Sequence, residues 1–285
     1  MSDTTLTHES VIARAGSHRV DDPVSFRLSD CDPDSTGDFS DEDKAVASAA
    51  LKVERGRIRQ LQERLYAEHG QSLLIVLQAT DTGGKDSTIR RVFKGVNPQG
   101  VRVWSFKEPS KEELDHDFLW RYHDHTPGKG MIAIFNRSHY EDVLIVRVKG
   151  LVPESVWSRR FGHINDFERL LTDNRTRVLK FFLNISREEQ RKRLQDRLDE
   201  SDKHWKFDSS DLAERARWDD YQVAFEDAIR KTSTEFAPWY VVPANHKWYR
   251  DLVVSQIVRE ALEAMGPQFP APSFDPAAYP PDSLV

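Results

Sequence analysis

One segment of this 285-residue chain gathers the residue types that bind phosphate. Residues 73–93, LLIVLQATDTGGKDSTIRRVF, read as a buried strand, a turn carrying Gly83, Gly84 and Lys85, and then a helix. A strand that ends in such a turn aims backbone N–H groups and a helix N-terminus at one point, where a lysine adds positive charge. The segment therefore predicts a binding site for a nucleotide or a polyphosphate chain.

The turn departs from the common phosphate-loop (Walker A) pattern G-x-x-x-x-G-K-[ST] at two positions. Ala79 stands at the first glycine position, and Asp86 replaces the Ser or Thr that normally meets Mg²⁺, with Ser87 and Thr88 directly after it. Asp81, inside the loop, is a hard oxygen ligand that could take the metal instead. The alternative is a turn whose glycines serve only the chain reversal; the strand before it and the helix after it favour phosphate binding.

A second group of polar residues follows the apolar stretch 131–135. The sequence MIAIFNRSHYED places Asn136, a neutral and therefore weaker Mg²⁺ ligand, at the strand end and Arg137 directly after it. Arg137 can grip a phosphate through two hydrogen bonds, and Glu141 is a candidate for binding a second metal or the acceptor nucleotide. A solvated strand end with ordinary caps is the alternative, and the presence of the Lys85 loop favours a functional role.

A zinc site is a competing hypothesis for the neighbouring region. His116, His123 and His125 stand close together in the sequence among several aspartates. The group contains no cysteine and no H-E-x-x-H pattern, so its spacing does not favour zinc.

A basic helix is predicted after the apolar stretch 178–183. It begins at Ser186, with Glu189 at the spacing of a capping box. Such a segment could close as a lid over a chain of phosphates and exclude water, and this is the economical interpretation after a phosphate-loop sheet. The alternative is an exposed helix laced with Glu–Arg pairs. The candidate lid residues are Arg191, Arg193, Arg197 and Lys203.

Strand and helix patterns alternate along the chain and define the fold class. The strand candidates are 73–78, 102–106, 131–135, 178–183 and 239–243, and helical patterns cover 111–123, 153–173, 186–201 and 211–232. This alternation predicts an α/β protein with a parallel sheet covered on both faces and a site at the carboxyl ends of the strands. A first helix is predicted from about 43 to 69, ended by Gly70; its shared apolar face comprises Leu51, Ile58, Leu61 and Leu65.

The two ends of the chain differ in composition from its centre. Residues 1–42 are polar and rich in Asp, Ser and Thr, which predicts an irregular arm. Residues 265–285 are rich in proline and predict an extended tail. The phosphate-binding domain is expected to span 43–264, with its lid at about 186–217.

Composition argues against several classes of protein. The formal net charge of −6 does not suit a general nucleic-acid binder. Cys31 is the only cysteine, so no internal disulfide can form, and a reducing compartment is favoured. The chain shows neither a basic-then-apolar leader nor a run of about 18 apolar residues, so we expect a cytoplasmic protein without a membrane partner.

Taken together, these segments resemble the polyphosphate kinase 2 family over about residues 30–263. ATDTGGKDST resembles its phosphate loop, FNRSHYEDVLIVRV resembles the second phosphate element of its class III subgroup, and KFFLNISREEQRKRL, KHWKF, WDDY and APWYVVPANHKWYRDLVV resemble its lid and C-terminal segments. The resemblance implies a three-layer α/β/α sandwich with a five-stranded parallel sheet and a helical lid, assembled as a dimer or tetramer. It also implies reversible transfer of the terminal phosphate of inorganic polyphosphate to AMP or ADP with Mg²⁺, or Mn²⁺ in its place.

Phosphoryl transfer needs alignment and charge neutralisation more than covalent catalysis. We therefore expect Asp81 to hold Mg²⁺, Lys85 to bridge the reacting oxygens and Arg137 to stabilise the transferred group. The further candidates for phosphate binding, partly through backbone N–H groups, are Thr82, Gly83, Gly84, Asp86, Ser87, Thr88 and Arg90. Asn136 and Glu141 are the candidates for a second metal or the acceptor.

Three other functions compete with this one. An ATP-dependent nucleoside monophosphate kinase could use the same fold, but the basic lid and Asp81 favour a long anionic donor. A nucleotide-dependent switch is disfavoured because the sequence lacks the N-K-x-D pattern that reads guanine. A protein that binds polyphosphate without turnover would bind it tightly and form no nucleotide product.

Overall fold

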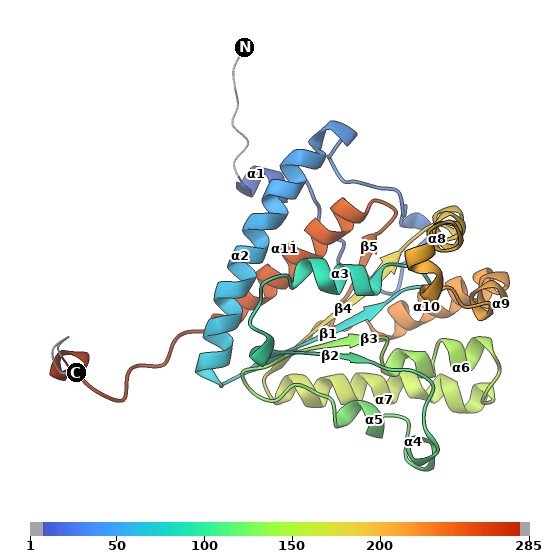
Figure 1. Cartoon of the computed structure of the whole chain (residues 1–285). Helices are drawn as coiled ribbons and strands as arrows, with labels where there is room; N and C mark the ends of the chain where they lie inside the picture. Colours follow the sequence, from blue (N-terminus) through green and yellow to red (C-terminus); the bar gives the residue numbers. More distant parts are fainter. Residues whose placement is uncertain (1–7, 280–285) are drawn as a thin grey trace.

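Five parallel strands form a single sheet at the centre of the protein (Figure 1). The computed structural model describes residues 8–279. The strands are β1 (Ser72–Gln78), β2 (Val101–Ser105), β3 (Ile132–Asn136), β4 (Thr176–Asn184) and β5 (Trp239–Pro243), in the order β2-β3-β1-β4-β5. All five predicted strands and their parallel arrangement are confirmed. β1 lies between β3 and β4, so the loop that follows it opens at the centre of the carboxyl edge.

Helices cover both faces of the sheet and give the three layers that the sequence predicts. On one face lie α2 (Lys44–Glu68), α3 (Lys85–Val92) and α11 (Lys247–Met265); on the other lie α7 (Glu154–Asp173) and α10 (Trp218–Thr232) (Figure 1). Alternate residues of β1 point to the two cores: Leu73, Ile75 and Leu77 to the first, Leu74 and Val76 to the second. A strand buried on both faces must be apolar throughout, which is why 73–78 reads as a continuous apolar run.

Shorter helices surround the carboxyl edge of the sheet. They are α4 (Lys111–Asp115), α5 (Trp120–His123), α6 (Ile145–Val148), α8 (Arg187–Asp199) and α9 (Ser210–Ala216). The six-residue 3₁₀ segment Ser201–Lys206 follows α8. The segment predicted as a lid therefore consists of α8, this 3₁₀ segment and α9, and it lies beside the ends of β1 and β4 (Figure 1).

Two of the predicted helices are wrong in that each is broken in two. The pattern at 111–123 divides into α4 and α5, because His116 is extended and the Asp117 carboxylate accepts the Leu119 N–H at 2.9 Å, starting a new turn. The pattern at 211–232 divides into α9 and α10 at Arg217, whose guanidinium donates to Val148 O on α6 at 2.5 Å. Periodicity does not detect such breaks because the apolar spacing continues across them.

Both ends of the first predicted helix, α2, agree with the sequence to within a residue. Its predicted face is confirmed, with Leu51, Ile58 and Leu65 buried and Leu61 packed against them. The capping residue differs, because His69, with φ of 54°, adopts the left-handed conformation and ends the helix in place of Gly70.

The N-terminal segment is more ordered than an irregular arm. It contains α1 (His8–Ala13) and buries Val11, Ile12 and Leu28 against the domain. Backbone bonds from Val20 N to Trp239 O (2.9 Å) and from Val241 N to His18 O (2.9 Å) cover the free edge of β5. At the other end, residues 266–279 leave the body after α11 (Figure 1). The predicted ends at 1–7 and 280–285 lie outside the described residues.

Among the described residues, no helix has the length and apolar character needed to cross a membrane.

A fully buried ionic cluster lies beneath the turn that follows β3. Lys180 on β4 contacts Glu168 on α7 at 2.5 Å, and both side chains are inaccessible to solvent. The Tyr140 hydroxyl donates to Glu168 at 2.8 Å, and Lys180 donates to Thr232 O at 2.7 Å. His139 also contacts Glu168, and burial lowers the pKa of its imidazole.

Removing one charge from this cluster will destabilise the fold far more than removing a surface charge. Lys180→Met leaves Glu168 buried without its cation, and we expect the free energy of unfolding to fall by about 3–5 kcal/mol. Lys44→Met, which breaks the exposed pair with Asp41, will change it by at most about 1 kcal/mol. Urea unfolding followed by tryptophan fluorescence measures both; equal losses would contradict the prediction. Adding Glu168→Gln to Lys180→Met should recover part of the loss.

Candidate functional site

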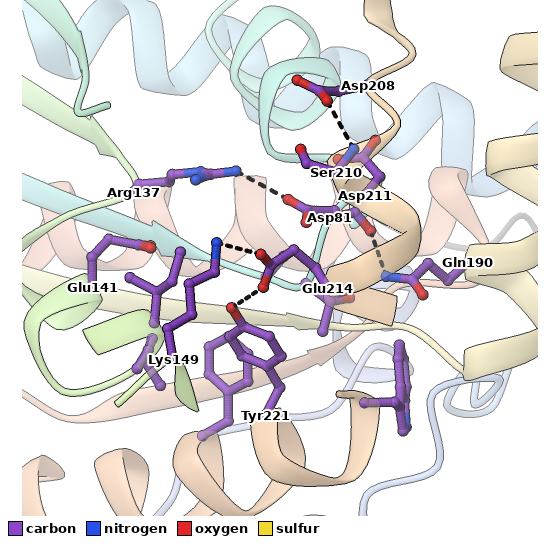
Figure 2. Close-up of a pocket in the computed structure, with 16 residues that line it drawn as sticks. Asp81, Arg137, Glu141, Lys149, Gln190, Asp208, Ser210, Asp211, Glu214 and Tyr221 are labelled. Carbon is purple, nitrogen blue, oxygen red and sulfur yellow. Dashed lines mark hydrogen bonds and ion pairs between the residues drawn. The ribbon is translucent and has the colours of Figure 1, made fainter. Parts of the chain in front are cut away.

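Two cavities meet at the carboxyl edge of the sheet. The larger, here called the phosphate cavity, has a volume of about 620 Å³ and is lined by the loop after β1 together with lid residues. The smaller, the side cavity, has a volume of about 270 Å³ and lies between the ends of β1 and β3, α6, α9 and α10 (Figure 2). The residues that line both cavities are Asp81, Arg137, Asp208 and Asp211.

The phosphate loop has a tightly fitted backbone. Gly83 is required because a Cβ there would clash with the methyl group of Ala79 and with Thr80 O. Gly84, with φ of 102°, adopts a conformation that favours glycine, and a Cβ there would clash with the Arg250 guanidinium. Ala79 can therefore replace the usual first glycine because Gly83 leaves room for its methyl group.

Helix α3 begins at Lys85 and directs its first N–H groups at the phosphate cavity. The N–H groups of the first turn lack intrahelical acceptors, and they carry the positive end of the helix dipole. The N–H of Thr88, in contrast, donates to Gly84 O at 2.9 Å, and its buried hydroxyl donates to the same oxygen at 3.0 Å. The structure thus brings Lys85, Asp86 and Ser87 to the cavity and leaves Thr88 inside the helix.

Lys85 lies half-buried in the phosphate cavity and donates to Ala79 O at 3.1 Å. Burial of the ammonium, together with the positive charge of Arg137, lowers the pKa of Lys85 to about 8. An anion bound beside this ammonium would stabilise its charged form.

Asp81 and Arg137 form an ion pair at the junction of the two cavities. Arg137 Nη2 donates to Asp81 Oδ1 at 3.0 Å, and Figure 2 shows this contact. Arg137 has φ of 63°, an uncommon conformation for a side-chain-bearing residue, and its N–H donates to Leu77 O at 3.2 Å. This turn points the guanidinium across the end of β1.

The two departures from the common phosphate loop contact each other. The Asn136 side-chain amide donates to Asp86 Oδ1 at 2.5 Å, across the ends of β3 and α3. Asn136 is therefore a donor here, held by the carboxylate that replaces the usual Ser or Thr.

The donor set at the junction fits Mg²⁺. Asp81 supplies a carboxylate whose Oδ2 is free of the Arg137 contact, and Asp86 lines the same cavity. Within residues 8–279, no group of three or more His, Cys, Asp or Glu side chains is arranged to hold a metal ion. Mg²⁺ binds readily through one or two carboxylates plus substrate phosphates and water. The three histidines considered for zinc include His116, stacked on Trp120, and His125, packed on Trp104.

The structure separates the four candidate lid residues. Arg193, Arg197 and Lys203 line the phosphate cavity, where Arg197 pairs with Asp211 at 3.0 Å. Arg193 is 7% exposed and donates to Thr82 O (3.1 Å) and Ala244 O (2.6 Å), which ties the lid to the phosphate loop. Arg191 pairs with the exposed Glu188 at 2.6 Å and lies outside the described lining of both cavities.

Arg90, predicted to reach an acceptor phosphate, is exposed on α3 and also lies outside the described cavity linings. Glu141, the candidate for binding a second metal or the acceptor, lines the side cavity.

Sequence reasoning missed most of the side cavity. Figure 2 shows Glu214 between Lys149 and Tyr221, which it contacts at 2.5 Å each. The flat or apolar residues that complete the wall include Leu144, Ile145, Trp218 and Phe225. The WDDY segment contributes Trp218 and Tyr221 to this wall. No spacing rule in the sequence identifies a pocket that is shared by three separate helices. The missed basic residues of the phosphate cavity are Lys107, Lys206 and Lys247.

A parallel sheet with a glycine loop after its central strand β1, an arginine after the neighbouring strand β3 and a helical segment that brings arginine and lysine to the cavity defines the P-loop kinase-like class. Residues 41–270 match the family model described as polyphosphate kinase 2 (PPK2). The chain belongs to the polyphosphate kinase 2 family.

Named relatives cover nearly the whole chain. The protein is 56% identical over 255 residues to the AMP/ADP-polyphosphate phosphotransferase of Meiothermus ruber, covering 90% of this chain and 95% of that protein. It is 45% identical over 241 residues to the ADP-polyphosphate phosphotransferase of Rhodopseudomonas palustris, covering 80% and 83%. The crystal structure of polyphosphate kinase 2 from Arthrobacter aurescens TC1 superposes with a TM-score of 0.86 at 45% identity, covering 91% of this chain and 95% of that one.

The lowered pKa of Lys85 predicts a pH-dependent affinity for phosphate chains. The ammonium is charged below pH 8 and neutral above it, so the affinity for tripolyphosphate should fall as the pH rises from 7 to 9. Lys85→Arg keeps its charge across this range and should lose that part of the dependence, which also corrects for ionisation of the ligand itself. Isothermal titration calorimetry at several pH values measures both proteins; superimposable pH profiles would contradict the prediction.

Proposed function

We propose that this protein transfers the terminal phosphate of inorganic polyphosphate to AMP and ADP, reversibly and with Mg²⁺. The observation that supports this most directly is the pair of cavities that meet at Asp81 and Arg137, one lined by eight cations beside six carboxylates and one partly apolar. The relative from Meiothermus ruber, whose name specifies both AMP and ADP, supports the same acceptors.

The phosphate cavity suits the donor. Its wall carries cations from the phosphate loop, the turn after β3, the lid and α11, so negative charge can be neutralised along a chain of phosphates. Phe106 is the one aromatic side chain among the described residues that line it, so the cavity offers little surface on which a nucleobase could stack. The cations are Lys85, Lys107, Arg137, Arg193, Arg197, Lys203, Lys206 and Lys247.

The side cavity suits the acceptor nucleotide. Trp218 and Tyr221 present aromatic surface for a purine or ribose, and Lys149 and Glu214 supply polar groups at its wall. A nucleotide held there would direct its phosphates towards Arg137 and Asp81, at the opening into the phosphate cavity. Donor and acceptor then approach from opposite sides of one ion pair, as an in-line transfer requires.

The residues of the junction act by holding charge and position. Mg²⁺ bound at Asp81 would neutralise charge on the phosphates and help to align them. Lys85 binds the oxygens of the reacting phosphates, and Arg137 stabilises negative charge on the group in transfer. The acceptor oxygen forms the new P–O bond while the bond to the shortened polyphosphate breaks, so no covalent link to the protein is needed.

An ATP-dependent monophosphate kinase is the less favoured function, because the described residues that line the phosphate cavity offer a second nucleobase only Phe106 as aromatic surface. We further infer a homo-oligomer, a dimer or tetramer, that works in the cytoplasm on polyphosphate and nucleotides, with residues 43–264 as its catalytic domain and about 186–217 as its lid. Light scattering after size-exclusion chromatography measures the assembly.

Incubating the purified protein with Mg²⁺, long-chain polyphosphate and AMP or ADP, followed by nucleotide chromatography, tests the function. We expect ADP and ATP from AMP, and ATP from ADP. Asp81→Asn should lower the rate roughly 100-fold or more, because an electrostatic contact at the reacting phosphates is lost. Transfer from ATP but not from polyphosphate would instead support the monophosphate kinase.

The lid arginines should differ in their effect on the donor. Arg197→Gln removes a charged contact from the phosphate cavity and should raise the KM for polyphosphate about tenfold. Arg191→Gln, on the outer side of the same helix, is the matched control and should change it less than twofold. Steady-state kinetics with polyphosphate varied at saturating ADP measures both; equal effects would place the donor elsewhere on the lid.

A further inference from the structure

A buried arginine lies directly beneath the phosphate loop. Arg250, on the first turns of α11, is 0% exposed, and its guanidinium fills the space where a Cβ on Gly84 would stand. Arg250 lies outside the described lining of both cavities, so its contacts are with the protein.

Its hydrogen bonds connect α11 to the start of α3. Nη2 donates to Ser87 Oγ at 3.1 Å, and Ser87 Oγ donates in turn to Gly84 O at 2.8 Å. Nε and Nη2 also donate to Asp251 Oδ1 at 2.9 and 2.6 Å. Asp251 Oδ2 accepts from Arg91 on α3 at 3.4 Å, so one buried carboxylate holds both arginines.

The orientation of the loop depends on where its carbonyl groups point. A phosphate cradle needs N–H groups directed inwards, and the carbonyl groups of the same peptides then point away and need donors. Gly84 O accepts from the N–H and hydroxyl of Thr88 and also from Ser87 Oγ, which Arg250 holds from below. Arg193 donates to Thr82 O from the lid side. Nη1 of Arg250 is a buried donor without a hydrogen-bond partner within residues 8–279.

We propose that Arg250 is a positioning residue: it fixes the conformation of the phosphate loop through Ser87 and Gly84 and leaves substrate contact to the loop itself. This inference rests on the proposed function, because it assigns Arg250 to the same transfer reaction. It also explains why a serine and a glycine occupy positions 87 and 84, since the guanidinium needs an acceptor at one and space at the other.

The test compares two buried arginines of the same helix. Arg250→Met removes the support under the loop, and Arg259→Met removes a guanidinium that contacts Glu54 and Glu263 instead. Both variants should lose thermal stability. Only Arg250→Met should lower kcat/KM for polyphosphate, by at least about tenfold, with the KM for ADP changed less than twofold. Arg250→Lys, which keeps a donor near Ser87, should recover part of the activity.

Each further result supports or overturns the proposal. If Arg250→Met fails to fold, Arg250→Lys and Ser87→Ala carry the test: both should lower kcat/KM for polyphosphate at a temperature where they remain folded. Wild-type kinetics in the folded variants, or an equal kinetic loss in Arg259→Met, would overturn it. If the wild-type protein makes no nucleotide, the proposed function fails, and tripolyphosphate binding by calorimetry decides on Arg250: at least about fivefold weaker binding in Arg250→Met than in Arg259→Met supports the role, and equal binding overturns it.

Discussion

Repulsion between like charges is the constraint on which this cleft depends. A polyanion needs many cations close together, and such a group is unfavourable until the substrate arrives. The structure relieves the repulsion by giving individual cations a carboxylate, as in Arg137 with Asp81 and Arg197 with Asp211. Lys85 donates to a carbonyl group instead, and burial together with the Arg137 charge lowers its pKa. Bound phosphates would offset the repulsion between the cations, as these carboxylates do.

The conformation of the phosphate loop also depends on the lid, because side chains of α8 donate hydrogen bonds to carbonyl groups of the loop. Arg193 lies on α8, yet two of its donors serve Thr82 O and Ala244 O, and Gln190 of the same helix donates to Asp81 O at 3.2 Å. The lid helix thereby holds the backbone that must present N–H groups to phosphate. An arginine that the sequence suggests as a phosphate ligand is thus occupied in supporting the loop, and the neighbouring turn of α8 supplies Arg197 for the cavity.

The sequence predicts the sheet and the loop well because their physical signals are local. A strand buried on both faces must be apolar throughout, and a phosphate loop must place glycine and lysine within a few residues. The side cavity has no such signal, since Lys149 directly after α6, Glu214 on α9 and Tyr221 on α10 come together only in the folded chain. The difference between Arg191 and Arg197 also depends on which side of α8 faces the sheet, and a helix that is charged on all sides does not reveal this.

The two unusual residues of the loop region are explained by each other. In many P-loop enzymes an aspartate ends the strand equivalent to β3, and a hydroxyl residue follows the lysine. Here Asp86 follows Lys85, and a carboxylate at position 136 would stand at hydrogen-bond distance from it without a proton to share. Asn136 removes that repulsion by donating its amide to Asp86. The exchange keeps one carboxylate beside the helix N-terminus and leaves Asp81 as the carboxylate that the phosphate loop itself places at the junction of the two cavities. Asp86 and Asn136 each depart from the common P-loop pattern, and the hydrogen bond between them explains both departures together.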